Sequence, residues 1–133
     1  MASGDKRIGT DGDSMPFGTE VICVGPLLQA TALDFTIYVP AGMGTIRVKK
    51  VRSITTVDTS GVSTITIKKA AQAMTGGTLV IANAGGVADE DYCDIVNDAH
   101  ARVPEETTIV LSHDGTPSAG EAIFFIEYER CQT

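Results

Sequence analysis

Apolar side chains recur at every second position in one early segment, at Leu33, Phe35, Ile37 and Val39. Successive side chains of a β-strand point to opposite faces of the sheet, so this alternation predicts a half-buried strand. The sequence P-A-G-M-G at 40–44 then ends the strand. Proline lacks the N–H that a strand donates, and glycine permits the positive φ angles that a chain reversal needs.

A second β-rich run, from Thr45 to Val57, follows at once and predicts the other half of a hairpin. Its apolar pattern changes phase, because Ile46 and Val48 share one parity and Val51 has the other. One extra residue in a strand turns every later side chain to the opposite face. The sequence therefore predicts a β-bulge near Lys49-Lys50.

The rest of the chain repeats short β-rich runs separated by turn-forming residues. We expect further strands at Thr19–Val24, Val62–Lys68, Thr78–Ala82, Glu106–Ser112 and Glu121–Arg130. Turns rich in Gly, Pro, Asp or Asn separate them, at 25–26, 58–61, 76–77, 83–86 and 113–117. About seven or eight short strands at roughly ten-residue spacing favour an antiparallel fold over one that alternates strands with helices. The sequence predicts an all-β, antiparallel β-sandwich or jelly-roll-like domain.

Three segments have a less regular pattern. Leu27 to Ala32 fits either a short strand or a covering loop. Lys69 to Thr75 fits one helical turn, which Gly76-Gly77 would end. For residues 87–105 we expect a long ordered connection that contains a short strand. The β structure should therefore be interrupted at these three places.

The N-terminal segment differs from the rest of the chain. Residues 1–18 show neither the alternating apolar pattern of a strand nor the apolar period of a helix, and they contain four glycines. The few apolar residues of this segment bury too little surface to offset the conformational entropy that ordering would cost. We therefore expect a flexible arm at 1–18, followed by a single β-sandwich domain at 19–133. The arm still contains apolar side chains that can dock on a partner: Ile8, Met15, Pro16 and Phe17. The alternative is a terminus without fixed structure.

Charge is unevenly placed along the chain. The formal net charge is −7, which disfavours a nucleic-acid partner, because such proteins usually carry a basic surplus. Residues 45–69 contain six Lys or Arg and one acid, whereas residues 70–133 contain eleven acids and two Arg. Opposite local charges can steer pairing between subunits or partners. The alternative is a pair of differently solvated sheet faces.

The basic residues gather in one run, at Arg47, Lys49, Lys50 and Arg52, with Lys68-Lys69 further along. Aromatic residues do not alternate with them, so the cluster is a weak signal for nucleic acid. We interpret it as a patch that docks on an acidic protein neighbour.

Cysteine usage and hydropathy indicate the compartment. Cys23, Cys93 and Cys131 are odd in number and contain no C-x-x-C spacing, which gives little support to a metal or redox motif. We expect reduced thiols, although one disulfide stays open. The start has no apolar core of a signal peptide, and no apolar run approaches the length of a membrane span. The expectation is a soluble protein, made without export and without a membrane partner.

Candidate catalytic groups are sparse. Ser112-His113-Asp114 contains the residue types of a hydrolase triad, but neighbouring strand residues point to opposite faces and cannot converge. His100 has no second histidine at metal-ligand spacing. Asp89-Glu90-Asp91 would gather a cation only in a tight fold, and an exposed acidic loop is the simpler interpretation. We expect no enzyme activity, metal or cofactor; an enzyme would need a carboxylate pair or metal site within 87–105.

The order of strands and turns carries a family resemblance. A strand and the turn at 40–44 lead into Thr45–Lys49, and a Thr75–Thr78 turn precedes Leu79–Ala82. A later strand then runs into the Asp114-Gly115 turn and a final apolar strand. Over residues 33–130 this order resembles small decoration (cement) proteins of tailed phages. The acid-rich Asp89–Asp94 segment and the cysteines have no counterpart in the family pattern.

The resemblance implies a β-sandwich that forms a homotrimer on the outer surface of the mature virion head, after synthesis in the host cytoplasm. Its partner would be the major capsid protein, whose neighbouring subunits it would bridge against the pressure of packaged DNA. No catalytic residues carry over from the family. The residues that we expect to contact the capsid or another subunit are Met15, Pro16, Phe17, Arg47, Lys49, Lys50 and Arg52.

A binding module of another class is the main alternative. A receptor- or glycan-binding β-sandwich, such as a fibre tip or a lectin-like domain, would expose aromatic side chains on its loops, because sugars stack on them. The chain has no Trp, and most of its seven aromatic residues lie in expected strands. The sequence therefore favours the capsid role.

Overall fold

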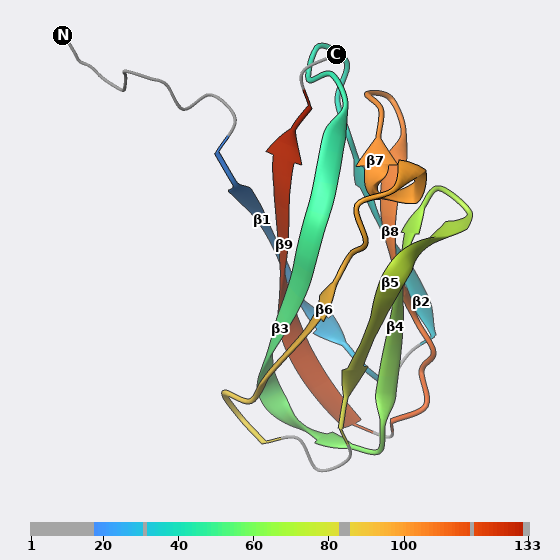
Figure 1. The fold of residues 1–133 in the computed structure, drawn as a ribbon. Coiled ribbons are helices and arrows are strands. Elements are labelled where there is room, and N and C mark those ends of the chain that lie inside the picture. Colours follow the sequence, from blue (N-terminus) through green and yellow to red (C-terminus); the bar gives the residue numbers. More distant parts are fainter. Residues whose placement is uncertain (1–17, 31, 83–85, 118, 132–133) are drawn as a thin grey trace, which may run out of the picture.

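The computed structural model describes residues 18–30, 32–82, 86–117 and 119–131, which form two packed antiparallel β-sheets (Figure 1). Sheet A has the order β1 (Glu20–Leu28), β9 (Ala119–Arg130), β3 (Ile46–Ser60) and β6 (Glu90–Asp94), and β7 (Arg102–Val103) also pairs with β3. Sheet B has the order β2 (Leu33–Tyr38), β8 (Thr108–His113), β4 (Ser63–Lys69) and β5 (Gln72–Ile81). The predicted all-β sandwich is confirmed, with nine strands in this part of the chain where the sequence indicated seven or eight.

The core lies between the inner faces of the two sheets. Sheet A contributes the apolar side chains at alternate positions of β3 and β9, and sheet B those of β4, β5 and β8. Fully burying one such side chain stabilises the fold by about 1.5–3 kcal/mol. The largest buried side chains are Phe124, Ile46, Ile65, Ile67, Leu79, Ile81, Ile109, Leu111 and Ile126.

The predicted β-bulge in β3 is confirmed. Val48 pairs with Tyr128 on β9, whereas Lys50, two residues later, pairs with Glu127, only one residue earlier. Lys49 is therefore the extra residue, and the buried positions of β3 change parity after it.

The first predicted strand was too short. The strand expected at Thr19–Val24 continues past Gly25-Pro26, whose peptide bond is cis, and ends at Leu28. The register against β9 shifts between Val24 and Leu27, which accommodates the proline. Because β1 is an edge strand, the missing N–H of Pro26 need not interrupt a ladder on both sides.

The predicted helical turn at Lys69–Thr75 is wrong. Ala70 and Ala71 form a tight turn between β4 and β5, with Ala70 at φ 52°, and β5 runs straight through Gly76-Gly77. A Cβ atom on Gly76 would lie 2.5 Å from the carbonyl oxygen of Asp94. These glycines therefore allow β5 to approach the β6 segment closely instead of ending an element.

The turn predicted at 58–61 is also displaced. β3 continues to Ser60, and the reversal takes place around Gly61, which has a φ of 108°. Glycine is the residue that adopts this backbone conformation without strain, so the final position of the predicted turn sets the reversal.

The connection after β5 covers one side of the sandwich. As predicted, residues 87–105 are ordered and contain a short strand, β6, followed by the 3-10 helix η1 (Ala99–Ala101) and β7. The N–H of Ile95 donates to the Lys49 carbonyl in sheet A, and the N–H of Val96 donates to the Thr75 carbonyl in sheet B. No helix within the described ranges is long and apolar enough to cross a membrane. The opposite side of the sandwich ends in the edge strands β1 and β2.

Candidate docking face

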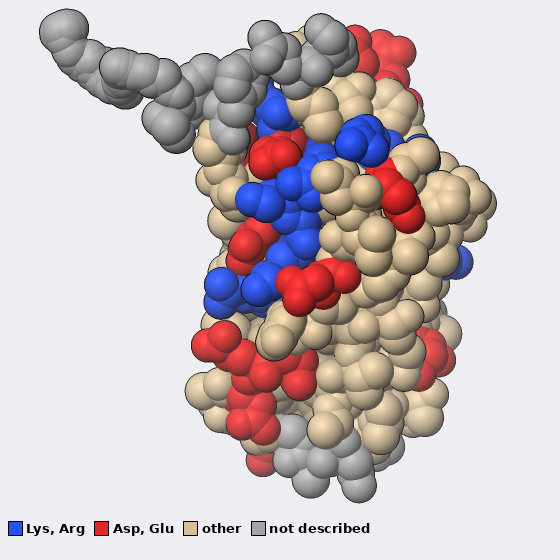
Figure 2. Space-filling model, in the orientation of Figure 1, with Lys and Arg blue, Asp and Glu red and all other residues tan. Residues whose placement is uncertain are grey.

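The four clustered basic residues all lie on the outer face of sheet A. Arg47 and Lys49 precede the change of phase and Lys50 and Arg52 follow it, so the bulge brings residues of both parities to one face. β3 lies between β9 and β6 in the sheet. The blue side chains of Figure 2 accordingly form a stripe with red ones on both of its sides.

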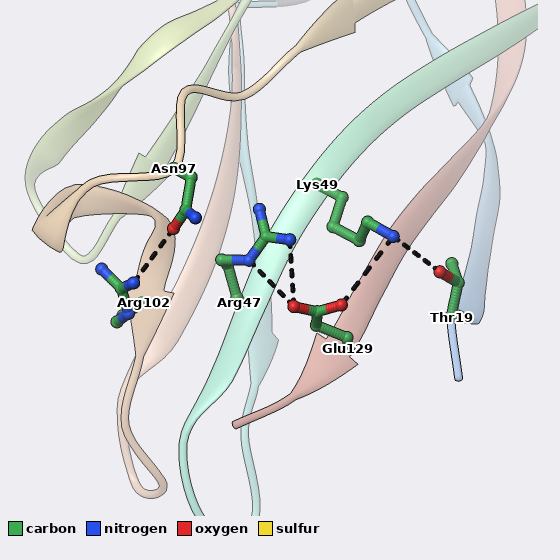
Figure 3. A network of polar contacts seen from close by, with 6 residues as sticks. All are labelled: Thr19, Arg47, Lys49, Asn97, Arg102 and Glu129. Carbon is green, nitrogen blue, oxygen red and sulfur yellow. Dashed lines mark hydrogen bonds and ion pairs between the residues drawn. The ribbon is translucent and has the colours of Figure 1, made fainter. Parts of the chain in front are cut away.

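Glu129 of β9 holds two of these bases (Figure 3). Its Oε2 accepts from Arg47 Nε at 3.1 Å and lies 2.9 Å from Nη2, and its Oε1 lies 3.8 Å from Lys49 Nζ. Lys49 Nζ also donates to Thr19 Oγ1 at 2.8 Å, next to the start of β1. Arg102 faces Arg47 across the β3–β7 pair and donates instead to Asn97 Oδ1 at 3.0 Å.

The other two bases pair with acids on both neighbouring strands. Arg52 Nε donates to Glu127 Oε2 at 2.7 Å, and its Nη1 lies 3.8 Å from Glu90 Oε1. Lys50 Nζ lies 3.6 Å from Asp94 Oδ1 and 4.7 Å from the centre of the Tyr92 ring. Exposed ion pairs of this kind contribute about 0.2–1 kcal/mol each.

The uneven charge of the sequence is therefore matched inside sheet A. The basic run of β3 lies between the acidic residues of β9 and β6, which come from the acidic half of the chain. A contact between the four bases and an acidic neighbour stays a prediction. Any such partner would have to compete with carboxylates that are already in place. Met15, Pro16 and Phe17 lie outside the residues that the structure describes.

The outer face of sheet A has a second, apolar half. We call the rows that contain Arg47 and Lys50 the charged half. In the next row Cys23 pairs with Phe125, and Arg52 is the β3 member of that row. Ile123 then pairs with Ile54, whose β6 partner is Glu90, and a further row contains Leu28, Glu121 and Val57. These rows form the apolar half. The sequence pattern did not single it out, because its residues come from three strands far apart in the chain.

A shallow hollow opens in this face, where the apolar half meets the charged half. It has a volume of about 290 Å³. Its lining comprises three apolar residues, two carboxylates and one arginine: Val21, Ile54, Phe125, Glu90, Glu127 and Arg52. Arg52 lies between the two carboxylates, so one wall of the hollow is a fixed ion-pair network and the remainder is apolar.

The outer face of sheet B has a different chemistry. One row across its four strands reads Asp34, Ser112, Thr66 and Thr78. Ser112 Oγ donates to Asp34 Oδ1 at 2.6 Å. Short hydroxyl side chains therefore replace the long charged side chains of sheet A.

Ser112, His113 and Asp114 do not converge, as expected for consecutive residues at a strand end. His113 is buried against Phe124, with the two ring centres 5.5 Å apart, whereas Ser112 is on the outer face. Asp114 accepts from the backbone N–H groups of Thr64 and Thr116. Burial lowers the pKa of His113, opposed by its hydrogen bonds to backbone carbonyls and by nearby acids.

The acid-rich segment forms part of an exposed edge. Asp89 Oδ2 accepts from the N–H of Gly86 at 2.7 Å, and burial, helped by the charge of Asp89, raises the pKa of Asp91. Among the residues with described positions, no three His, Cys, Asp or Glu side chains lie close enough together to hold a metal ion.

The three cysteines are free in the structure. Cys23 is exposed on β1, Cys131 is partly buried, and Cys93 is buried. Burial raises the pKa of the Cys93 thiol to about 11, which keeps it protonated at neutral pH.

Sequence reasoning missed an internal anion site at the P-A-G-M-G turn. Glu105 Oε1 accepts from the N–H of Gly44 at 2.9 Å and from that of Gly42 at 3.2 Å. Both glycines have positive φ, so their N–H groups turn toward one oxygen. The two glycines of the turn were a signal for such a nest, but the distant Glu105 was not identifiable from sequence.

Comparison with known proteins adds no relative. No family model matches the chain, and neither the curated proteins nor the solved structures contain a match.

Proposed function

We propose that the chain is a structural virion protein that decorates the mature head of a tailed phage. In this role a homotrimer sits on the outer surface and bridges neighbouring subunits of the major capsid protein. The order of strands and turns over residues 33–130, which resembles the phage decoration proteins, carries the proposal.

The construction of sheet A supports a mechanical role. Its central strand β3 is hydrogen-bonded along most of its length to β9, and side-chain ion pairs join β3 to both of its neighbours. Pulling one strand past another would break several of these contacts at once. A rigid sheet of this kind suits a protein that holds capsid subunits together under internal pressure.

A trimer would also strengthen weak individual contacts. Three copies of one contact multiply their effect when the geometry lets all of them engage together. The arm at 1–18, with Met15, Pro16 and Phe17, is our candidate for one such contact, and the basic residues of β3 are the second.

Binding to capsids tests the proposal. The purified protein, mixed with expanded and unexpanded phage heads, should sediment with the expanded form. Deleting residues 1–18 should weaken this binding while the circular dichroism of the β core is unchanged. Sedimentation with neither form would overturn the capsid role, and a monomer in light scattering would contradict the trimer.

A receptor- or glycan-binding module is the second candidate, because two tyrosines are exposed. Tyr38 and Tyr92 are 58% and 63% exposed as whole residues. Aromatic rings can stack on sugars, but Lys50 covers the Tyr92 ring, which leaves Tyr38 as the more accessible platform. Reproducible hits on a glycan array that disappear in a Tyr38→Ala variant would favour this function.

A further inference from the structure

The apolar half of sheet A needs an explanation of its own. The outer face of a solvated sheet is usually polar, yet Cys23 and Val21 are exposed here beside the partly buried Ile54, Ile123 and Phe125. These side chains come from three adjacent strands and adjoin the hollow of about 290 Å³. Contiguous apolar surface with a concave centre is typical of an interaction site.

The charges around this surface restrict what can cover it. Glu90 and Glu127 line the hollow with Arg52 as their shared cation, and Glu121 lies in the next row without an ion pair to any described residue. Figure 2 shows further acidic side chains gathered beyond one end of the basic stripe. A fitting occupant therefore combines an apolar side chain with positive charge. A second copy, packed with the same half face to face, would bring like charges together.

The chain itself contains a segment of this composition. Residues 1–17 lie outside the described part of the structure. Their only basic residues are Lys6 and Arg7, which lie between Asp5 and Ile8, and their other acids, Asp11 and Asp13, follow further along. Two cations next to a branched apolar side chain match the carboxylates and the apolar floor of the hollow.

The segment is long enough to reach this site on its own chain. Residues 9–18 span up to roughly 33–36 Å when extended. Thr19 directly precedes β1 and accepts a hydrogen bond from Lys49. Ile54 lies five residue steps beyond Lys49 on β3, or about 16 Å along the strand. The linker can therefore turn back and place Ile8 over the hollow.

We propose that Lys6, Arg7 and Ile8 dock on the outer face of sheet A of their own chain. Ile8 fills the hollow beside Ile54 and Phe125, and the two cations lie against Glu90 and Glu121. The docked segment covers the apolar half and shields Cys23, which neighbours Phe125. This docking does not depend on the capsid role.

Alkylation of Cys23 by iodoacetamide measures the docking in the full chain, with the modified site identified by mass spectrometry. The variant Lys6→Gln/Arg7→Gln/Ile8→Ser should react about fivefold faster at Cys23 than the wild type, because the thiol loses its cover. Loss of the two positive charges alone would slow the alkylation instead, because cations near a thiol favour its reactive thiolate form. Cys131 serves as an internal reference whose rate should not change.

A matched control keeps the test specific. Asp11→Asn/Asp13→Asn/Met15→Ser also removes two charges and one apolar side chain from the same segment, and it should leave the Cys23 rate within about twofold of the wild type. A charge exchange, Lys6→Glu/Arg7→Glu with Glu90→Lys/Glu121→Lys, should restore the protection that either pair alone removes. Equal Cys23 rates in the wild type and the Lys6/Arg7/Ile8 variant would overturn the proposal.

Protein concentration separates docking on the same chain from exchange between copies. Docking within one chain gives protection of Cys23 that does not change on dilution. Protection that disappears on dilution would overturn the intramolecular form, because an arm from a second copy would then be the occupant.

Discussion

The two outer faces of the sandwich use the same backbone and opposite side-chain chemistry. A row across sheet A reads Val21, Glu127, Lys50 and Asp94, whereas a row across sheet B reads Asp34, Ser112, Thr66 and Thr78. In this row sheet A joins its strands with long charged side chains, whereas sheet B has three short hydroxyl side chains and one carboxylate. Each row crosses four strands, so the number of strands does not explain the contrast.

The difference favours one face as the proposed binding surface. Threonine favours strands because its side chain is β-branched, and it presents no charge to a partner. The charged side chains of sheet A frame an apolar area and a hollow, which is the usual composition of an interaction surface. We therefore propose the outer face of sheet A as the recognition surface and a mainly structural role for the outer face of sheet B.

Inserting one alanine between Val51 and Arg52 should have the largest effect, because a second extra residue in β3 reverses the phase that the bulge sets for the later half of the strand. Arg52 would turn into the core and Ser53 would turn outward, which buries a charge without a partner. The variant should lose its cooperative thermal transition. Lys50→Ala keeps the chain length and should change the free energy of unfolding by no more than about 1 kcal/mol. A cooperative transition in the insertion variant would show that the single bulge does not fix the register of β3.

Acid should destabilise the protein by protonating His113, which lies on the inner face of sheet B. His113 is 4% exposed, and burial lowers its pKa from 6.5 despite the opposing charges of Asp34 and Asp114. The unfolded chain binds a proton near pH 6.5 that the folded chain does not yet bind, so stability falls as the pH drops from there toward the lower folded-state pKa. Urea midpoints as a function of pH measure this effect.

In the variant His113→Leu the free energy of unfolding should no longer fall between pH 6.5 and the lower folded-state pKa of this histidine. His113→Gln serves as a second variant if leucine packs poorly at this position. The same loss of stability below pH 6.5 in both variants would assign it to other groups. The charged half of sheet A would then be the place to search, since acid also neutralises its carboxylates.

The contrast between the faces was only partly predictable from sequence. The period-2 pattern identified the strands, and the change of parity between Val48 and Val51 located the bulge. Both signals are local, because they depend on side chains that are close along one strand.

The pairing of charges was not predictable in the same way. Arg47 and Glu129 are 82 residues apart, and their contact depends on which strands become neighbours in sheet A. The error at Gly76-Gly77 has the same origin. Glycines are needed there because Asp94, far along the chain, approaches β5, whereas local sequence statistics associate such glycines with the end of an element.

Replacing the four bases of β3 by Gln should have an intermediate effect. Each lost ion pair costs about 0.2–1 kcal/mol, so the free energy of unfolding of the variant should fall by about 1–3 kcal/mol. The variant should remain folded at room temperature. If these bases also contact the capsid, binding to expanded heads should fall by more than in Lys68→Gln/Lys69→Gln, which removes charge elsewhere. Capsid binding equal to that of this control would restrict the four bases to their role within sheet A.

The smallest and sharpest test compares one contact on each face by double-mutant cycles. On sheet A the pair is Arg47 and Glu129, whose side chains are 17% and 30% exposed; on sheet B it is Asp34 and Ser112. We expect a coupling of about 0.5–1 kcal/mol for Arg47→Gln with Glu129→Gln. High salt should weaken this coupling, because it screens an ion pair at the surface. The coupling of Asp34→Asn with Ser112→Ala should change less with salt, since only one of its partners is charged. Equal salt dependence in the two cycles would mean that the faces differ in composition but not in the forces that hold their strands together.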